Sequence, residues 1–149
     1  MMKRKKITFV CTGNTCRSPM AEAILRAEIK RRRIKWWDVA SCGLRAEVGG
    51  TISPNSKAAL EEINIPVKGF SPRQLTDKQI QGSTLIVTMT ESQRLSLGEH
   101  GNVRSVMEMC GYDIPDPYGC GLEVYRITRD ALVSVCNTII DEYILKFEE

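Results

Sequence analysis

Short apolar runs alternate with helix-like periodic stretches along most of the chain. Runs rich in β-branched and other apolar residues, typical of strands, lie at 7–10, 37–41, 84–89 and 103–107. The run at 84–89 is almost unbroken apolar, as expected of a strand buried on both faces of a parallel sheet. Apolar residues spaced i, i+3, i+4 and i+7 predict a long helix over 122–147.

Residues that favour helix starts lie between these runs. The first helix is predicted to have Pro19 in its first turn. Further helices are predicted to begin at Pro54 behind a possible Ser53 cap, after Thr76 and after Thr90. Their predicted spans are 54–63, 77–81 and 91–97, and turn-forming residues make 44–53 and 110–121 loops. Strands that alternate with helices predict an α/β fold, a single-domain doubly wound sheet of about four parallel strands with helices on both faces. The predicted domain spans 1–149.

The loop CTGNTCRS at 11–18 joins the first predicted strand to the first predicted helix. Such a loop directs its amide N–H groups and the positive end of the helix dipole to one place, which favours an anion. Cys11 begins the loop and Arg17 closes it, with five residues between them. N–H donors and an arginine stabilise a thiolate, and the same groups can hold the oxygens of a phosphoryl group. The loop therefore predicts attack by Cys11 on phosphorus, giving a phosphocysteine intermediate.

Composition and charge narrow the function classes. The 149 residues have a net charge of +3, and the one basic run, 30–35, fits the end of a helix better than a nucleic-acid surface. No apolar run approaches the roughly 18 residues of a membrane span, and the N-terminus does not read as a signal peptide. The six cysteines are expected to be reduced thiols, without zinc spacing. A cytoplasmic protein with neither a nucleic-acid nor a membrane partner is expected.

The chain resembles the low-molecular-weight protein phosphatases. C-x5-R-S directly after the first strand, followed by PMAEA, matches that family, and DPYG at 116–119 matches the motif of its general acid. VASCG at 39–43, RQLT at 73–76 and LIVTM at 85–89 fit in the same order, so the resemblance covers nearly the whole chain. It implies a flavodoxin-like or Rossmann-like phosphatase fold, phosphorylated proteins as substrates, no obligate partner, and neither a metal nor an organic cofactor.

The resemblance and the loop chemistry together assign roles to individual residues. Cys11 is the expected nucleophile, Arg17 the phosphate clamp and Asp116 the general acid and base. The expected substrate-binding residues are Thr12, Gly13, Asn14, Thr15, Cys16, Ser18 and Tyr118, with Ser41 supporting the loop. Ser18 is expected to donate to the Cys11 thiolate.

Simpler readings exist for several of these residues. Asp113 is the weaker candidate for the acid because it lacks the DPYG context. Tyr118 would wall the pocket or be an ordinary half-buried aromatic residue. Cys16 would either form a reversible disulfide that protects Cys11 from over-oxidation or simply fill the loop.

Residue 15 bears most directly on the substrate. Tyrosine-directed members resemble one another in carrying a bulky apolar residue there, whereas bacterial protein-arginine phosphatases carry Thr in a CTGNTCRS loop, as in this chain. Gly119 replaces a second aromatic residue after Asp-Pro-Tyr, and Thr90 stands where many tyrosine-directed members have Asp. We therefore expect hydrolysis of phosphoarginine, with phosphotyrosine as the alternative.

Three other classes fit less well. Thiol-dependent arsenate reductases share the loop but need a redox cysteine pair near 80–90, and no cysteine lies between Cys42 and Cys110. A non-catalytic phosphate-binding module would not need both Cys11 and Asp116. A dinucleotide-binding domain would need G-x-G-x-x-G, and the loop has only Gly13.

Overall fold

Strand β1 (Lys5–Cys11) is an inner strand of a parallel sheet with the order β2-β1-β3-β4. The computed structural model describes residues 3–147, and within them the sheet has four strands, with β2 at Trp37–Gly43, β3 at Leu85–Thr88 and β4 at Val103–Ser105. Every neighbouring pair is parallel. The predicted sheet of about four parallel strands is confirmed.

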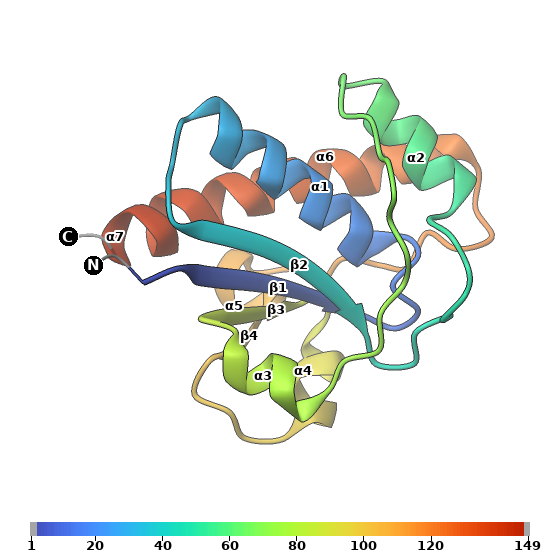
Figure 1. Ribbon diagram of the computed structural model, residues 1–149. Helices are drawn as coiled ribbons and strands as arrows, with labels where there is room; N and C mark the ends of the chain where they lie inside the picture. The colour runs from blue at the N-terminus through green and yellow to red at the C-terminus, as the bar shows by residue number, and fades with distance from the viewer. Residues whose placement is uncertain (1–2, 148–149) are drawn as a thin grey trace.

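Helices cover both faces of the sheet, as predicted (Figure 1). One face carries α1 (Arg17–Arg31), α2 (Pro54–Glu61) and the long α6 (Leu122–Ile139), and the other carries α3 (Asp77–Gly82) and α4 (Glu91–Leu97). The short α5 (Val106–Cys110) follows β4 and contacts both α4 and α6. Within residues 3–147 no helix combines the length and the hydropathy that crossing a bilayer requires.

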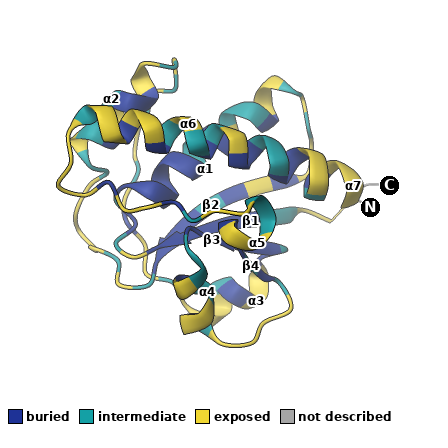
Figure 2. Ribbon diagram, turned by 180° about the vertical axis from the view of Figure 1, so that it is seen from behind, coloured by how far each residue is buried: buried dark blue, intermediate teal, exposed yellow. Residues whose placement is uncertain are grey.

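Alternation along β1 divides the core between the two faces. Ile7 and Phe9 pack with α1 and α6, whereas Val10 belongs to a smaller cluster with Ile86 and Val103 on the opposite face. Figure 2 shows that α6 buries one side and exposes the other. The sheet is therefore held on both faces, which fixes the position of the loop that leaves β1.

Three helix starts match the cap residues identified in the sequence. Ser53 accepts a hydrogen bond from the backbone N–H of Ser56 at the start of α2. Thr76 and Thr90 each form a capping box with a glutamine three residues later, at the starts of α3 and α4. Gly98, with φ of 79°, ends α4 at Leu97, so the predicted span 91–97 is confirmed.

The predicted fourth strand, 103–107, is wrong over its second half. Ser105 Oγ accepts from the N–H of Glu108, and Glu108 Oε1 accepts from the N–H of Ser105. This capping box begins α5 at Val106, so β4 ends at Ser105. The apolar residues Val106 and Met107 therefore belong to a helix.

The last predicted helix, 122–147, is not a single α-helix. α6 ends at Ile139, a π-helical turn spans Ile140–Ile144, and α7 follows at Leu145–Phe147. Ile139, Ile140 and Ile144 are all fully buried. A π turn has wider i→i+5 spacing, which lets neighbouring Ile139 and Ile140 both face the core together with Ile144.

The carboxyl ends of β1 and β3 lie side by side at the point where the strand order reverses. The chain runs from β1 to β2 on one side and then crosses β1 to reach β3 on the other. Ligands of such sheets bind in the crevice at this switch point. Cys11 is the last residue of β1, so the loop that it begins opens into this crevice.

Candidate active site

Residues of the 11–17 loop line a cavity of about 210 Å³. It is formed by Cys11, Thr12, Gly13, Thr15, Cys16, Arg17, Arg45, Glu47, Asp116 and Tyr118. The structure thus brings the expected nucleophile, clamp and acid to one cavity, although they are separated by up to 105 residues in sequence. The expected residues Asn14, Ser18 and Ser41 do not line it and lie buried behind the loop.

A chain of hydrogen bonds leads to Cys11 from behind. Cys11 Sγ lies 2.8 Å from Ser18 Oγ. Asn14 Nδ2 donates to Ser18 Oγ at 2.8 Å and to Ser41 Oγ at 2.9 Å. Ser41 Oγ in turn donates to Glu22 Oε1 at 2.8 Å. The support that Ser41 gives to the loop therefore runs through Asn14.

The direction of this chain follows from its two ends. An ionised carboxylate only accepts, so the Ser41 hydroxyl donates its hydrogen bond to Glu22 and its oxygen accepts from Asn14. The backbone N–H of Arg73 donates to Asn14 Oδ1 at 2.9 Å, which turns the amide NH₂ toward the two serines. Ser18 Oγ already accepts from Asn14, so its own proton is directed at Cys11 Sγ.

Two residues suit the backbone conformation of the loop: Asn14 within it and Gly43 at the end of the adjacent strand β2. Asn14 has φ of 58°, a left-handed conformation that asparagine tolerates better than most residues. Gly43, at the end of β2, touches the loop so closely that an added Cβ would lie 2.7 Å from the carbonyl oxygen of Thr12. Only glycine permits this approach, which brings the segment after β2 against the loop.

Arg17 is buried although it begins α1, with only 5% of its surface exposed. One nitrogen, Nη1, donates to the carbonyl of Ile114 at 3.0 Å, and Nη2 lies 3.8 Å from Asp116 Oδ2. The guanidinium is thus fixed to the loop that bears Asp116 while it lines the cavity. A positive charge held in this place suits a phosphoryl group.

Asp116 and Asp113 have different environments. Asp116 lines the cavity, and its Oδ1 accepts from the N–H of Tyr118 at 3.1 Å. Asp113 does not line the cavity, and its Oδ1 accepts from the N–H of Glu91 at the start of α4, at 2.9 Å. Asp113 therefore caps the N-terminus of α4.

Tyr118 is 73% exposed at the mouth of the cavity. The alternative reading of Tyr118 as a half-buried aromatic residue is therefore wrong. Its side chain also lines an adjoining hollow beside Ser53, Pro54 and Asn55 at the start of α2. The ring thus stands between the cavity and the neighbouring surface.

Cys16 is buried, and its Sγ lies 3.5 Å from the hydroxyl of Tyr125. Burial, together with the Cys16 contact, raises the pKa of Tyr125 to about 12, so this hydroxyl stays protonated at neutral pH. Cys11 and Cys16 are both free thiols in this structure.

Thr90 does not line the cavity. It caps α4, and its capping partner Gln93 donates from Nε2 to Thr12 Oγ1 at 3.3 Å. Thr90 therefore touches the site only through Gln93.

Four further residues were not identified from the sequence. Glu22 ends the hydrogen-bond chain, Gln93 contacts Thr12, and Arg45 and Glu47 line the cavity. The segment 44–53 was predicted only as a loop, since nothing in its sequence indicates which strand end it packs against. Gln93 had a visible signal, the T-x-x-Q capping box.

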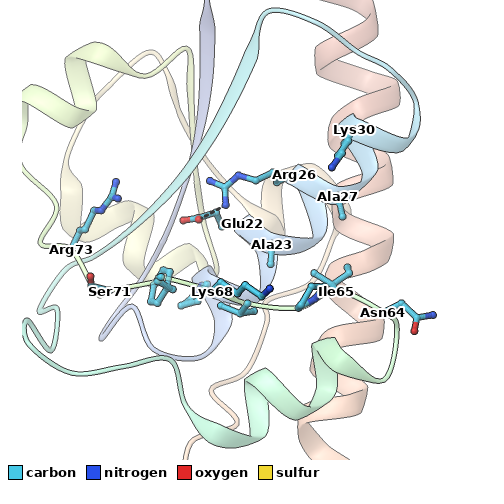
Figure 3. Close-up of a pocket in the computed structure, with 15 residues that line it drawn as sticks. Glu22, Ala23, Arg26, Ala27, Lys30, Asn64, Ile65, Lys68, Ser71 and Arg73 are labelled. Carbon is cyan, nitrogen blue, oxygen red and sulfur yellow. Dashed lines mark hydrogen bonds and ion pairs between the residues drawn. The ribbon is translucent and has the colours of Figure 1, made fainter.

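A larger hollow of about 390 Å³ lies elsewhere, between α1 and the segment 64–73 (Figure 3). No cysteine lines it. Figure 3 shows Glu22 and Arg26 joined there, with Arg26 Nη1 2.8 Å from Glu22 Oε2. Among residues 3–147 no cluster of three or more His, Cys, Asp or Glu side chains is placed to hold a metal ion.

Comparisons with known proteins agree with the fold. The model of the family described as low molecular weight phosphotyrosine protein phosphatase matches residues 6–146. The low molecular weight protein-tyrosine-phosphatase PtpB of Staphylococcus haemolyticus is 37% identical over 134 residues, which cover 86% of this chain and 92% of that protein. A protein-arginine-phosphatase of Bacillus subtilis is 34% identical over 134 residues, covering 85% and 88%.

A solved structure extends the likeness to three dimensions. The YwlE arginine phosphatase from Geobacillus stearothermophilus superposes with a TM-score of 0.83 at 31% sequence identity, covering 95% of this chain and 94% of that one. Family model, relatives and fold all agree, and the chain belongs to the low molecular weight phosphotyrosine protein phosphatase family.

Proposed function

We propose that this protein removes phosphate from phosphorylated arginine side chains of proteins through a phosphocysteine intermediate on Cys11. The observation that supports this most strongly is the meeting of Cys11, Thr15, Arg17 and Asp116 in one small cavity. These groups supply a nucleophile, a polar wall, a positive charge and a proton donor within reach of one phosphoryl group.

The reaction follows in two steps. The Cys11 thiolate attacks phosphorus, the P–N bond breaks, and the leaving guanidino nitrogen takes a proton from Asp116. A water molecule then gives a proton to the Asp116 carboxylate and attacks phosphorus, and the P–S bond breaks. Inorganic phosphate leaves and the thiolate is restored, stabilised by the hydroxyl of Ser18.

The anion is held by the loop itself. Arg17 is anchored by the carbonyl of Ile114, so its fork needs little reorganisation to bind the phosphoryl oxygens. The loop amides and the N-terminus of the 15-residue α1 add positive potential at the same place. The reaction therefore needs no cofactor, because the chain supplies nucleophile, charge and proton.

The choice of phosphoarginine rests on the walls of the cavity. Thr15 presents a hydroxyl there, and Gly119 leaves Tyr118 as the aromatic residue at the mouth. The Thr15 hydroxyl and the carboxylates of Glu47 and Asp116 can accept hydrogen bonds from a guanidinium, which a phenyl ring cannot donate. The related protein of Bacillus subtilis is named a protein-arginine-phosphatase.

Phosphotyrosine is the second candidate. The exposed ring of Tyr118 at the mouth could stack on a phenyl ring, and the Staphylococcus haemolyticus relative is named a protein-tyrosine-phosphatase.

We further propose that the substrates are phosphorylated proteins and that the protein works in the cytoplasm. A thiol nucleophile needs a reducing compartment, and the six cysteines are free in this structure.

Trapping of the intermediate tests the proposed chemistry. The wild type is mixed with a phosphoarginine-containing protein, quenched in acid within one turnover, and digested for mass spectrometry. The expected result is phosphate on the peptide that contains Cys11, and no phosphate on the matching peptide of Cys11→Ala, which has no nucleophile at this position. Release of phosphate by Cys11→Ala at the wild-type rate would contradict the proposal.

A further inference from the structure

The segment 44–53 is fixed against the catalytic loop by four backbone hydrogen bonds. The N–H groups of Leu44, Arg45, Glu47 and Ser53 donate to the carbonyls of Cys11, Thr12, Gly13 and Thr15 at 2.9, 2.9, 3.1 and 2.9 Å. These bonds pair the segment with the loop almost residue by residue. The segment is therefore a wall of the cavity whose backbone is held in place.

Glu47 is the acidic residue that this wall presents to the cavity. A Cβ added at Gly13 would lie 3.8 Å from Glu47 Oε2, which places the carboxylate over the loop backbone. The turn after Glu47 is tight, because Gly50 N–H donates to the Glu47 carbonyl at 2.9 Å and Gly49 has φ of 89°. Among residues 3–147 the Glu47 carboxylate makes no hydrogen bond or ion pair.

The Glu47 carboxylate, the second in this cavity, is unfavourable for binding a phosphate ester whose leaving group is an uncharged phenyl ring. Asp116 already contributes one carboxyl group, and the phosphoryl group of the substrate is itself an anion. A carboxylate at the mouth repels that anion and finds no hydrogen-bond donor on a phenyl ring. Its presence suits a substrate whose leaving group bears N–H donors and positive charge.

We propose that Glu47 binds the guanidinium of the substrate arginine and determines specificity for phosphoarginine over phosphotyrosine, an inference that rests on the function proposed above. The phosphorylated nitrogen faces Asp116, which protonates it as the P–N bond breaks. The remaining N–H groups of the planar guanidinium form an edge that a carboxylate accepts in bidentate fashion. Glu47 contacts that edge and has no part in the proton transfers.

The test compares the wild type, Glu47→Gln and Glu61→Gln on two peptides that differ only in phosphoarginine or phosphotyrosine. Glu61, the exposed last residue of α2, lies outside the cavity, so its variant matches the loss of one negative charge. We measure kcat and KM for each pair at low and at high salt. The expected result for Glu47→Gln is a fall of about fivefold or more in the phosphoarginine-to-phosphotyrosine ratio of kcat/KM, smaller at high salt.

Each outcome bears on one proposal. An unchanged ratio in Glu47→Gln, with active wild type on phosphoarginine, overturns the role of Glu47 and leaves the proposed function standing. An equal fall on both peptides assigns Glu47 a structural role and also overturns the inference. A wild type that does not hydrolyse phosphoarginine contradicts the proposed function itself. A ratio that falls equally in Glu61→Gln shows a general charge effect and overturns the inference.

Discussion

Ser41 donates a 2.8 Å hydrogen bond to Glu22, and this contact acts with the bond from Arg73 N–H to Asn14 Oδ1 to set the direction of the hydrogen bonds that lead to Cys11. Glu22 lies on the second turn of α1, and Ser41 lies on β2. Because the carboxylate only accepts, the Ser41 oxygen is left to accept from Asn14. The proton of Ser18 is then directed to Cys11 Sγ, 2.8 Å away.

Glu22→Ala is expected to lower kcat by about tenfold, because the Ser41 hydroxyl then loses its acceptor and its oxygen is no longer held in place to accept from Asn14. Alkylation of Cys11 by iodoacetamide at neutral pH should slow as well. Glu22→Gln is the matched control, since its amide oxygen can still accept from Ser41. If Ala and Gln variants of equal thermal stability lose the same activity, the directional chain is not what supports the thiolate.

Asp116→Asn is expected to lower kcat on phosphoarginine by about 10²- to 10⁴-fold, the usual contribution of general acid–base catalysis. The leaving guanidino nitrogen is a poor leaving group without a proton. Asp113→Asn should leave both kcat and the melting temperature nearly unchanged, because its amide oxygen can still accept from Glu91 N–H and cap α4. Steady-state kinetics and thermal melts of the two variants separate the roles. A larger kcat loss in Asp113→Asn would reverse the assignment.

Thr15→Ile replaces the hydroxyl in the cavity wall by an apolar surface. We expect kcat/KM for a phosphoarginine peptide to fall by about tenfold and that for a phosphotyrosine peptide to rise. Thr15→Ser keeps the hydroxyl and should retain the wild-type preference. A preference that is the same in Thr15→Ile and Thr15→Ser would show that the hydroxyl does not choose the substrate.

Cys42 and Cys136 are expected to resist alkylation in the folded protein at pH 7.5. Burial raises the pKa of Cys42 to about 11 and raises that of Cys136 as well, so both remain neutral thiols below that range. Brief labelling with iodoacetamide followed by peptide mass spectrometry should modify Cys11 and the exposed Cys120 first. Labelling of Cys42 at the rate of Cys120 without denaturant would show that the β2 end opens to solvent.

Much of the fold follows from local sequence patterns. The apolar run that contains β3 predicts a buried strand without reference to other residues, and Ser53, Thr76 and Thr90 mark their helix starts directly. The same reasoning missed α5, because an apolar run at 103–107 outweighed the S-x-x-E capping box that begins at Ser105. The π turn after Ile139 depends on core packing, which a single helical period does not represent.

The candidate site likewise contains residues that the sequence predicts and residues that it does not. Its loop residues could be predicted because thiol, arginine and glycine share one short segment. Glu22 and Glu47 could not, since their importance depends on contacts across the fold, with Ser41 on β2 and with Gly13 in the loop. Tyr118 was predicted to wall the pocket, but its high exposure depends on how the surrounding loops pack, which the local sequence does not show.

The ratio of wild-type kcat/KM for phosphoarginine and phosphotyrosine peptides of identical sequence tests the central claim most directly. The claim predicts a preference for phosphoarginine by about tenfold or more, since Thr15, Asp116 and Glu47 all offer polar or charged contacts to a guanidinium. A preference for phosphotyrosine would contradict it and make the protein a tyrosine phosphatase with a threonine in its loop.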